Sequence, residues 1–470
     1  MVVQHNLQAM NANRMLNVTT GAQSKSTEKL SSGYKINRAA DDAAGLTISE
    51  KMRKQIRGLD KASSNAQDGV SSVQTAEGAL TEVHSMLQRM NELAVQAANG
   101  TNSKDTDRKA IQDEIDQLNT EIDRVAETTK FNEIYLLKGD DGEKTINLNA
   151  HDAGLKGTLV DNGSGKATFT MKELSVGDSV SIGGKNYTIG STAADAQKIV
   201  TGQEKAGGKV TVNGVEYTYN DTDKKWKDAA GADVQIGTGA AAGKIVIGDG
   251  DKVSDGTTTL TAMTDKKDAT GAAKADGVDD NDNSVISAEK AYSLAKDELV
   301  AANHIGDTEN TAAVAQDTTN KNVFTITTGS AKVANTLSFS LHVGADADMT
   351  NKITVDIDTM NSANLGIKGL NVTDKNGTAA TYAIDAISDA ISKVSSQRSA
   401  LGAVQNRLEH TIDNLDNISE NTSSAESRIR DTDMAKEMVN YSKNNILAQA
   451  GQSMLAQANQ SNQGVLSLLQ

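Results

Sequence analysis

A seven-residue repeat of small and apolar residues runs through an early part of the chain. It is nearly unbroken from Leu59 to about Asn99. One row of the repeat is Leu59, Ala66, Val73, Leu80, Leu87 and Ala94, and the other is Ala62, Gly69, Ala76, Val83, Met90 and Ala97. Apolar residues at two positions of a heptad are typical of helices that pack along their length. The pattern therefore predicts a long helix, which ends at the turn-rich sequence NGTNS.

Two further segments have the same kind of periodicity. In the first, Ile111, Ile115, Leu118, Ile122 and Val125 are spaced four, three, four and three apart. The second extends from about Tyr382 to Ala425, with rows Ile387, Val394, Leu401, Leu408 and Leu415, and Ala390, Gln397, Val404, Thr411 and Ile418. Each helix alone would leave an apolar stripe in water. We expect the three helices to form one bundle, with the ends of the chain close together and the middle inserted between them.

The middle of the chain, from about 140 to 380, changes to a period of two with Gly, Thr and Asp at the breaks. The segment KVTVNGVEYTY alternates around Asn213–Gly214, and DSVSIGGKNYTI alternates around Gly183–Gly184. Both patterns predict β-hairpins. The segment LSFSLHVGADADMTNKITVDIDTM predicts another strand pair, and only one amphipathic helical segment is expected, near Ile286–Ala302. The predicted fold class is mainly α with a β-rich insertion of one or two lobes.

Composition supports long helices and excludes several functions. The 470 residues contain no proline, so no helix is interrupted by loss of an amide donor. They contain no cysteine, which excludes disulfides and thiolate chemistry. The formal charge of −15 argues against a nucleic-acid partner. We also expect no signal peptide at the start of the chain and no membrane insertion.

The last 27 residues, from Asn444, form an unusual tail. They contain no Asp, Glu, Lys or Arg, and ten of them are Asn or Gln. Disordered tails are normally charged and poor in leucine, and a membrane span would not carry so many amides. The tail therefore suits a crowded protein interface.

The residues that flank these periodic segments are similar to a known family. The stretch EKLSSGYKINRAADDAAGLTISEKMRKQIRGLDKASSNAQDGVSSVQTAEGALTEV resembles the N-terminal region of bacterial flagellins. LGAVQNRL, SRIRDTDMAKEM and QAGQSMLAQANQSNQGVLSLLQ resemble their C-terminal region. The resemblance covers about 1–140 and 382–470, and the middle resembles nothing that we can name.

The resemblance implies three layers in a subunit of a hollow extracellular filament used for motility. Residues 1–45 with 431–470 would form an inner coiled coil that becomes ordered on assembly, because an isolated helix pair is marginal in water. Residues 46–139 with 337–430 would form a helical shaft with a β-hairpin, and 140–336 a variable surface insertion. The expected partners are further copies of the chain, an export chaperone, the filament cap and hook-junction proteins. Export as an unfolded chain through the flagellar type III apparatus is also implied.

Two polar motifs have alternative interpretations. NRAADDAAG contains Arg38, Asp41 and Asp42, which either make a turn with a helix N-cap or contact another subunit. SRIRDTDMAKEM places Arg428 and Arg430 before Asp431 and Asp433, either of which could cap a helix. The two arginines are then available for ion pairs with another subunit.

A third polar surface lies on the first long helix, at LQRMNELAVQ. Gln88, Arg89 and Gln96 face outward from the apolar rows, and Leu93 adjoins them. The ordinary interpretation is a solvated face. In flagellins that a vertebrate Toll-like receptor recognises, this stretch and the next helix form the contact surface. Carried over, that implicates Gln88, Arg89, Leu93, Gln96 and Glu114.

No residue pattern predicts catalysis, a metal or a cofactor. The six histidines are scattered and none forms an H-E-x-x-H motif. GTGAAAGKI, residues 237–245, lacks the spacing and the Ser or Thr of a phosphate-binding loop, so a glycine-rich turn is expected. Two alternatives to a filament subunit remain at this point: a hook–filament junction protein, and a secreted adhesin or enzyme that uses flagellin-like ends.

Overall fold

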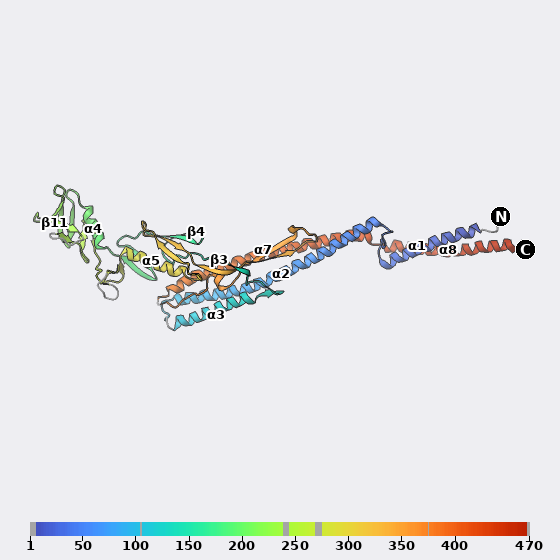
Figure 1. Cartoon of the computed structure of the whole chain (residues 1–470), viewed down its shortest axis with the longest axis horizontal. Coiled ribbons are helices and arrows are strands. Elements are labelled where there is room, and N and C mark those ends of the chain that lie inside the picture. Colours follow the sequence, from blue (N-terminus) through green and yellow to red (C-terminus); the bar gives the residue numbers. More distant parts are fainter. Residues whose placement is uncertain (1–5, 104–105, 238–243, 268–274, 375, 468–470) are drawn as a thin grey trace. The chain divides into compact units, whose positions relative to one another are not determined.

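The computed structural model describes residues 6–103, 106–237, 244–267, 275–374 and 376–467. Eight α-helices occur in this part of the chain. They are α1 (Leu7–Ser32), α2 (Ala43–Ala98), α3 (Asp107–Thr128), α4 (Ala193–Gly202), α5 (Ala288–Asn303), α6 (Ser362–Leu365), α7 (Thr378–Arg430) and α8 (Met434–Ser467) (Figure 1). The chain divides into two compact units, one of 1–73, 339–355 and 402–470 and the other of 74–338 and 356–401.

In the first unit, α1 lies beside α8 (Figure 1). The Asn6 side chain caps α1 by accepting a hydrogen bond from the N–H of Ala9, and its amide donates to the carbonyl of Ala458 at 3.0 Å. Gly33 ends α1 in the left-handed conformation, with φ of 76°, which glycine adopts without strain. The termini of the described chain are thus neighbours, as the periodicity predicts.

The first unit also contains the start of α2, the end of α7 and a β-hairpin. Strands β19 (Leu337–His342) and β20 (Lys352–Ile357) pair, as the alternation predicts, with a 3₁₀ turn at Met349–Asn351 between them. Ala66 and Leu408 pack with Val343 and Ile353 of this hairpin region in one apolar cluster. A Cβ atom at position 69 would overlap Leu341, so Gly69 allows the hairpin to approach α2 closely.

The second unit contains the end of α2, all of α3 and the start of α7. Arg108 fixes the turn between α2 and α3. Its guanidinium, which is 1% exposed, donates to the carbonyls of Ala97 at 2.8 Å, Asn99 at 3.2 Å and Asp374 at 2.9 Å. Ala97 and Asn99 lie at the end of α2, where helix carbonyls have no partner within the helix. The long hydrophobic helices are therefore joined through one buried cation.

The insertion belongs to the second unit and is rich in strands. The strands before β19 are β1 (Lys130–Phe131), β2 (Ile134–Tyr135), β3 (Asp140–Asn147), β4 (Gly157–Gly163), β5 (Lys166–Met171), β6 (Ser179–Ile182), β7 (Lys185–Ile189), β8 (Lys209–Val212), β9 (Val215–Asn220), β10 (Lys225–Lys227), β11 (Asp233–Gly237), β12 (Lys244–Val246), β13 (Lys252–Ser254), β14 (Thr259–Thr261), β15 (Val285–Ile286), β16 (Ala313–Gln316), β17 (Val323–Thr327) and β18 (Ser330–Asn335). The larger sheets have the orders β12-β11-β10-β9-β8-β13-β14 and β16-β17-β5-β4. Mainly α with a β-rich insertion is therefore the fold class, as predicted.

Two separate apolar cores occur in the insertion. One contains Phe169, Phe324 and Tyr292, with α5 packed on it, and the other surrounds Trp226 and Tyr219 beside α4. Both predicted hairpins are confirmed, because Ile182 pairs with Lys185 and Val212 with Val215 across the glycine-containing turns.

The expectation of a single helical segment in the insertion is wrong, because α4 is a second one. Thr192 and Asp195 form a reciprocal capping box at its start. Only ten residues long, α4 has too few turns to show a clear helical period in the sequence.

Candidate assembly and recognition surfaces

The predicted bundle residues are nearly all buried. Those less than 9% exposed are Leu59, Ala66, Val73, Leu80, Val83, Leu87, Met90, Ile111, Ile115, Ile122, Val394, Leu401, Leu408 and Leu415. Leu118 and Val404 are partly exposed. The heptad pattern thus identified side chains that each unit buries.

The helix pair of α1 and α8 has the opposite character, because many of its large apolar side chains face solvent. Exposed residues on it are Leu7, Met10, Met15, Val18, Met434, Met438, Val439, Ile446, Leu447 and Met454. Val18 is 62% exposed and Val439 is 67% exposed, whereas Ser26 is the buried residue of α1. Contiguous exposed apolar surface on a water-soluble helix pair marks a place where other protein packs.

The turn that holds Arg38, Asp41 and Asp42 is organised within the subunit. Asp42 caps α2 by accepting from the N–H of Gly45 at 2.9 Å. Asp41 accepts from the N–H groups of Arg38 and Asn37, which together lower its pKa. The guanidinium of Arg38 pairs with Glu28 at 2.9 Å and stays 72% exposed. The N-cap interpretation therefore holds for Asp42, and a contact between subunits remains a prediction for Arg38.

At the other end of the chain, Asp433 rather than Asp431 caps the helix, because it accepts from the N–H of Lys436. Arg430 is 12% exposed and pairs with Glu50 at 2.8 Å. Its guanidinium also lies 4.8 Å from the centre of the Tyr34 ring, which contacts Arg53 as well. Arg430 is therefore occupied inside its own subunit and is a poor candidate for a subunit contact, whereas Arg428 is exposed.

Arg89 connects two helices on the predicted receptor surface. Its guanidinium pairs with Glu114 of α3 at 2.9 Å and with Glu92 at 3.1 Å. The hydrogen bond to Glu114, followed by that to Glu92, raises the pKa of Arg89. All three side chains are solvent-accessible, at 51% for Arg89, 43% for Glu114 and 69% for Glu92. A charged ridge thus lies across α2 and α3, and Glu92 is a member of it that the prediction did not include.

Other members of that surface differ in exposure. Gln88 and Gln96 are exposed, and the amide of Gln88 contacts His84. Leu93 is only 2% exposed, so its assignment to the receptor surface is wrong. Its position explains the error, because it lies three residues after Met90 and four before Ala97, both buried. That spacing places Leu93 on the buried face, which is wider here than two heptad rows.

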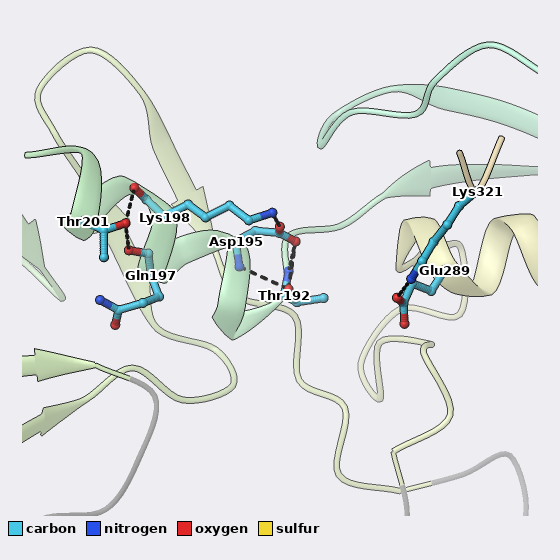
Figure 2. Close-up of polar contacts among 7 residues, drawn as sticks. All are labelled: Thr192, Asp195, Gln197, Lys198, Thr201, Glu289 and Lys321. Carbon is cyan, nitrogen blue, oxygen red and sulfur yellow. Dashed lines mark hydrogen bonds and ion pairs between the residues drawn. The ribbon is translucent and has the colours of Figure 1, made fainter. Parts of the chain in front are cut away.

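A cleft of about 1040 Å³ in the insertion was not predicted from the sequence. Figure 2 shows two lysines at it: Lys198 reaches Asp195 at 2.9 Å, and Lys321 reaches Glu289. Hydroxyl groups of the lining are also engaged, since Ser287 caps α5 and Tyr292 accepts from the N–H of Leu174. The charges of the two pairs cancel locally, which leaves the cleft without a free cation or nucleophile among these residues.

Within the described residues there is no group of three or more His, Cys, Asp or Glu side chains placed to hold a metal ion. Likewise, no helix in that part of the chain is long and apolar enough to cross a bilayer. Most of the segment with a faint likeness to a phosphate-binding loop, 238–243, lies outside the described residues.

Long amphipathic helices, together with a terminal helix pair that exposes its apolar side chains, define a self-associating structural protein. Comparison with known proteins agrees with that class. The profile of the bacterial flagellin N-terminal helical region matches residues 3–141, and that of the bacterial flagellin C-terminal helical region matches residues 384–469. The chain belongs to the bacterial flagellin family, and it is a structural subunit of a flagellar filament.

Relatives match over almost the whole chain. A flagellin of Clostridium tyrobutyricum is 39% identical over 467 residues, which cover 98% of this chain and 100% of the relative. Flagellin D of Vibrio anguillarum is 36% identical over 469 residues, 99% of each chain. The solved FliC structure from Burkholderia pseudomallei is 19% identical, covers 72% of this chain and 99% of its own, and has a TM-score of 0.27. At that TM-score the structural likeness adds nothing to the sequence comparison. The match at both ends disfavours the junction-protein and adhesin alternatives.

Proposed function

We propose that this subunit polymerises through α1 and α8, and that these helices become ordered when they do so. The observation that supports the proposal is the apolar surface that α1 and α8 leave exposed, of which Val18 and Val439 are the clearest examples. Ordering a helix costs conformational entropy, and burial against neighbouring copies offsets that cost. The charge-free tail after Lys443 suits such burial, because a charge inside a crowded tube would need a partner there.

Dependence of order on assembly also suits export. A subunit whose ends are unfolded before assembly does not polymerise prematurely, and it can pass through the flagellar type III apparatus as an unfolded chain. The export chaperone, the filament cap and hook-junction proteins are then the partners that meet the ends of the chain before and after export. The finished polymer is extracellular.

Seeded polymerisation tests the proposal. Purified full-length subunit with short filament seeds is expected to grow into long hollow tubes in electron micrographs, and a chain limited to residues 46–430 is not. Hydrogen exchange should be fast in both ends of the monomer and slow in the filament. Growth of tubes from the shortened chain, or protected ends in the monomer, would refute the proposal.

A second function is favoured by the ridge of Arg89, Glu92 and Glu114. We propose that this ridge binds a vertebrate Toll-like receptor when the subunit is free. Support comes from the accessibility of the three charged groups and from the ion pairs of 2.9 Å and 3.1 Å that hold Arg89 across two helices. A preorganised arginine is a common anchor of protein interfaces.

A further inference from the structure

Three exposed cations form a stripe on α2 in the first unit. Lys54, Arg57 and Lys61 are spaced three and four residues apart, which places them on one face of the helix. The buried residues of the same stretch, Leu59 and Ala62, lie elsewhere around the helix. None of the three cations is in an ion pair with another described residue of the subunit. We refer to Lys54, Arg57 and Lys61 as the basic stripe.

An acidic counterpart lies on α7 in the same unit. Glu409, Asp413, Asp416 and Glu420 are spaced four, three and four apart, and all four are exposed. Their side-chain contacts within the described chain are with neutral groups: Gln405 donates to Glu409 at 2.8 Å, and Ser63 donates to Asp416 at 3.0 Å. No described cation pairs with any of them. We refer to these four residues as the acidic stripe.

Other charged groups of this unit are paired, which makes the two stripes distinct. Arg38 pairs with Glu28, and Arg430 with Glu50, both within 3 Å. Like charges three or four residues apart on a helix destabilise it. Each stripe therefore carries repulsion that the isolated subunit does not relieve, although the chain contains both signs.

We propose that the basic stripe of one copy docks on the acidic stripe of the next copy in the filament. This inference rests on the proposed function, because it specifies a surface through which the polymer grows. The two stripes are different surfaces of one chain, so their contact is head-to-tail. A head-to-tail contact that does not close generates an open helical polymer, whereas a self-complementary contact would stop at a dimer.

Complementary stripes would set the register of each incoming subunit and speed its encounter with the filament end. Charge complementarity acts mainly on association rate and on the exclusion of wrong arrangements. It is weakened by salt, because exposed charges are screened over about 10 Å at 0.1 M ionic strength. The apolar surface of α1 and α8 then supplies most of the stability of the contact.

Charge reversal in the full chain tests the contact. One variant carries Lys54→Glu, Arg57→Glu and Lys61→Glu, and a second carries Glu409→Lys, Asp413→Lys and Glu420→Lys. Asp416 is kept because it holds Ser63. Seeded growth is followed by sedimentation of polymer at low salt. Each variant alone is expected to raise the concentration of unpolymerised subunit at equilibrium about tenfold, since several exposed pairs change from attraction to repulsion.

The two variants mixed in equal amounts should polymerise nearly as well as the unaltered chain, because alternating copies restore opposite charges at every contact. A chain that carries all six reversals should also polymerise by itself. The matched control is Lys156→Glu, Lys205→Glu and Lys224→Glu, which makes the same change of formal charge on exposed residues of the insertion. Circular dichroism checks that helix content is unchanged in every variant.

The outcomes separate this inference from the proposed function. If the unaltered chain does not polymerise, the proposed function fails. If it polymerises and the reversed variants equal both it and the control, or if mixing gives no recovery, the stripes do not meet. Recovery on mixing, absent from the insertion control, would establish the contact.

Discussion

Tyr382 of α7 donates a hydrogen bond of 2.5 Å from its phenol oxygen to Glu298 of α5. The ring is 5% exposed and belongs to the apolar core that contains Phe169 and Phe324. A polar bond at the edge of that core therefore joins a helix of the insertion to a helix of the bundle within the second unit. Residues 84 positions apart in the sequence make this bond.

Tyr382→Phe should lower the stability of the second unit by about 1 to 2 kcal/mol, the size expected for a hydrogen bond to a charged group. Burial, followed by the bond to Glu298, raises the pKa of Tyr382. A raised pKa means that the folded chain retains a proton that the unfolded chain loses, so stability falls as pH rises above about 10. Urea unfolding from pH 8 to 11 measures both effects. An alkaline slope that persists in the phenylalanine variant would contradict this account.

Arg108→Leu should cost about 3 kcal/mol, because three carbonyls that Arg108 satisfies would lose their donor in a buried place. Lys109→Leu is the matched control, since Lys109 is 68% exposed and pairs only with Asp113. Denaturant unfolding of the two variants should show a large loss for the first and a change below about 0.5 kcal/mol for the second. Equal losses would mean that the carbonyls at the end of α2 find other partners.

Asp307 should make the insertion sensitive to acid. Its side chain is 0% exposed, and burial alone would raise its pKa. Hydrogen bonds from the N–H groups of Ala312, Ser330 and Glu309 outweigh burial, and the pKa is lowered. The ionised carboxylate therefore stabilises the fold above the ordinary aspartate pKa, about 3.9, and this stability is lost as pH falls through the lowered folded-state value.

Thermal unfolding between pH 2 and 6 measures that acid dependence. Asp307→Asn should unfold at a lower temperature near neutral pH and should lose part of the acid dependence. Asp297→Asn, which changes an exposed aspartate on the neighbouring helix, should behave like the unaltered chain. A normal acid profile for Asp307→Asn would show that the hydrogen bonds to its carboxylate do not depend on charge.

Arg89→Ala should weaken receptor activation by the free subunit about tenfold or more, as expected when a central arginine is removed from an interface. A cell reporter of Toll-like receptor signalling gives the readout. Arg124→Ala is the control, because Arg124 is also exposed and also pairs with a glutamate of its own helix, Glu121. Seeded polymerisation should be unchanged in both variants, which separates receptor binding from assembly. Unchanged signalling by Arg89→Ala would remove the ridge as a receptor surface.

Several features followed from the sequence with little ambiguity. Heptad rows predicted the long helices and most of their buried side chains, because burial of a helix face depends on spacing alone. The Asn-Gly and Gly-Gly turns predicted two hairpins, because only residues that tolerate positive φ fit such turns. Here Asn213 has φ of 51° and Gly183 has φ of 57°. Periodicity also placed the two ends of the chain together.

Other features could not be derived in this way. Leu93 looked like a surface residue because two heptad rows seemed sufficient to define the buried face, and the width of a buried face depends on how many neighbours the helix has. Arg430 looked free because its partners Glu50 and Tyr34 are almost 400 residues away in the sequence. The short helix α4 gave too weak a periodic signal.

By itself, the sequence determined which segments are helices and strands, which side chains must be buried, and which family the ends resemble. These properties depend on local spacing and local backbone preference. Only the tertiary structure decided which charges are satisfied: Arg89, Arg108 and Arg430 are held by groups from other segments, whereas the basic and acidic stripes are not. Pairing of charges requires proximity in space, and proximity between distant segments is fixed only when the hydrophobic faces have packed.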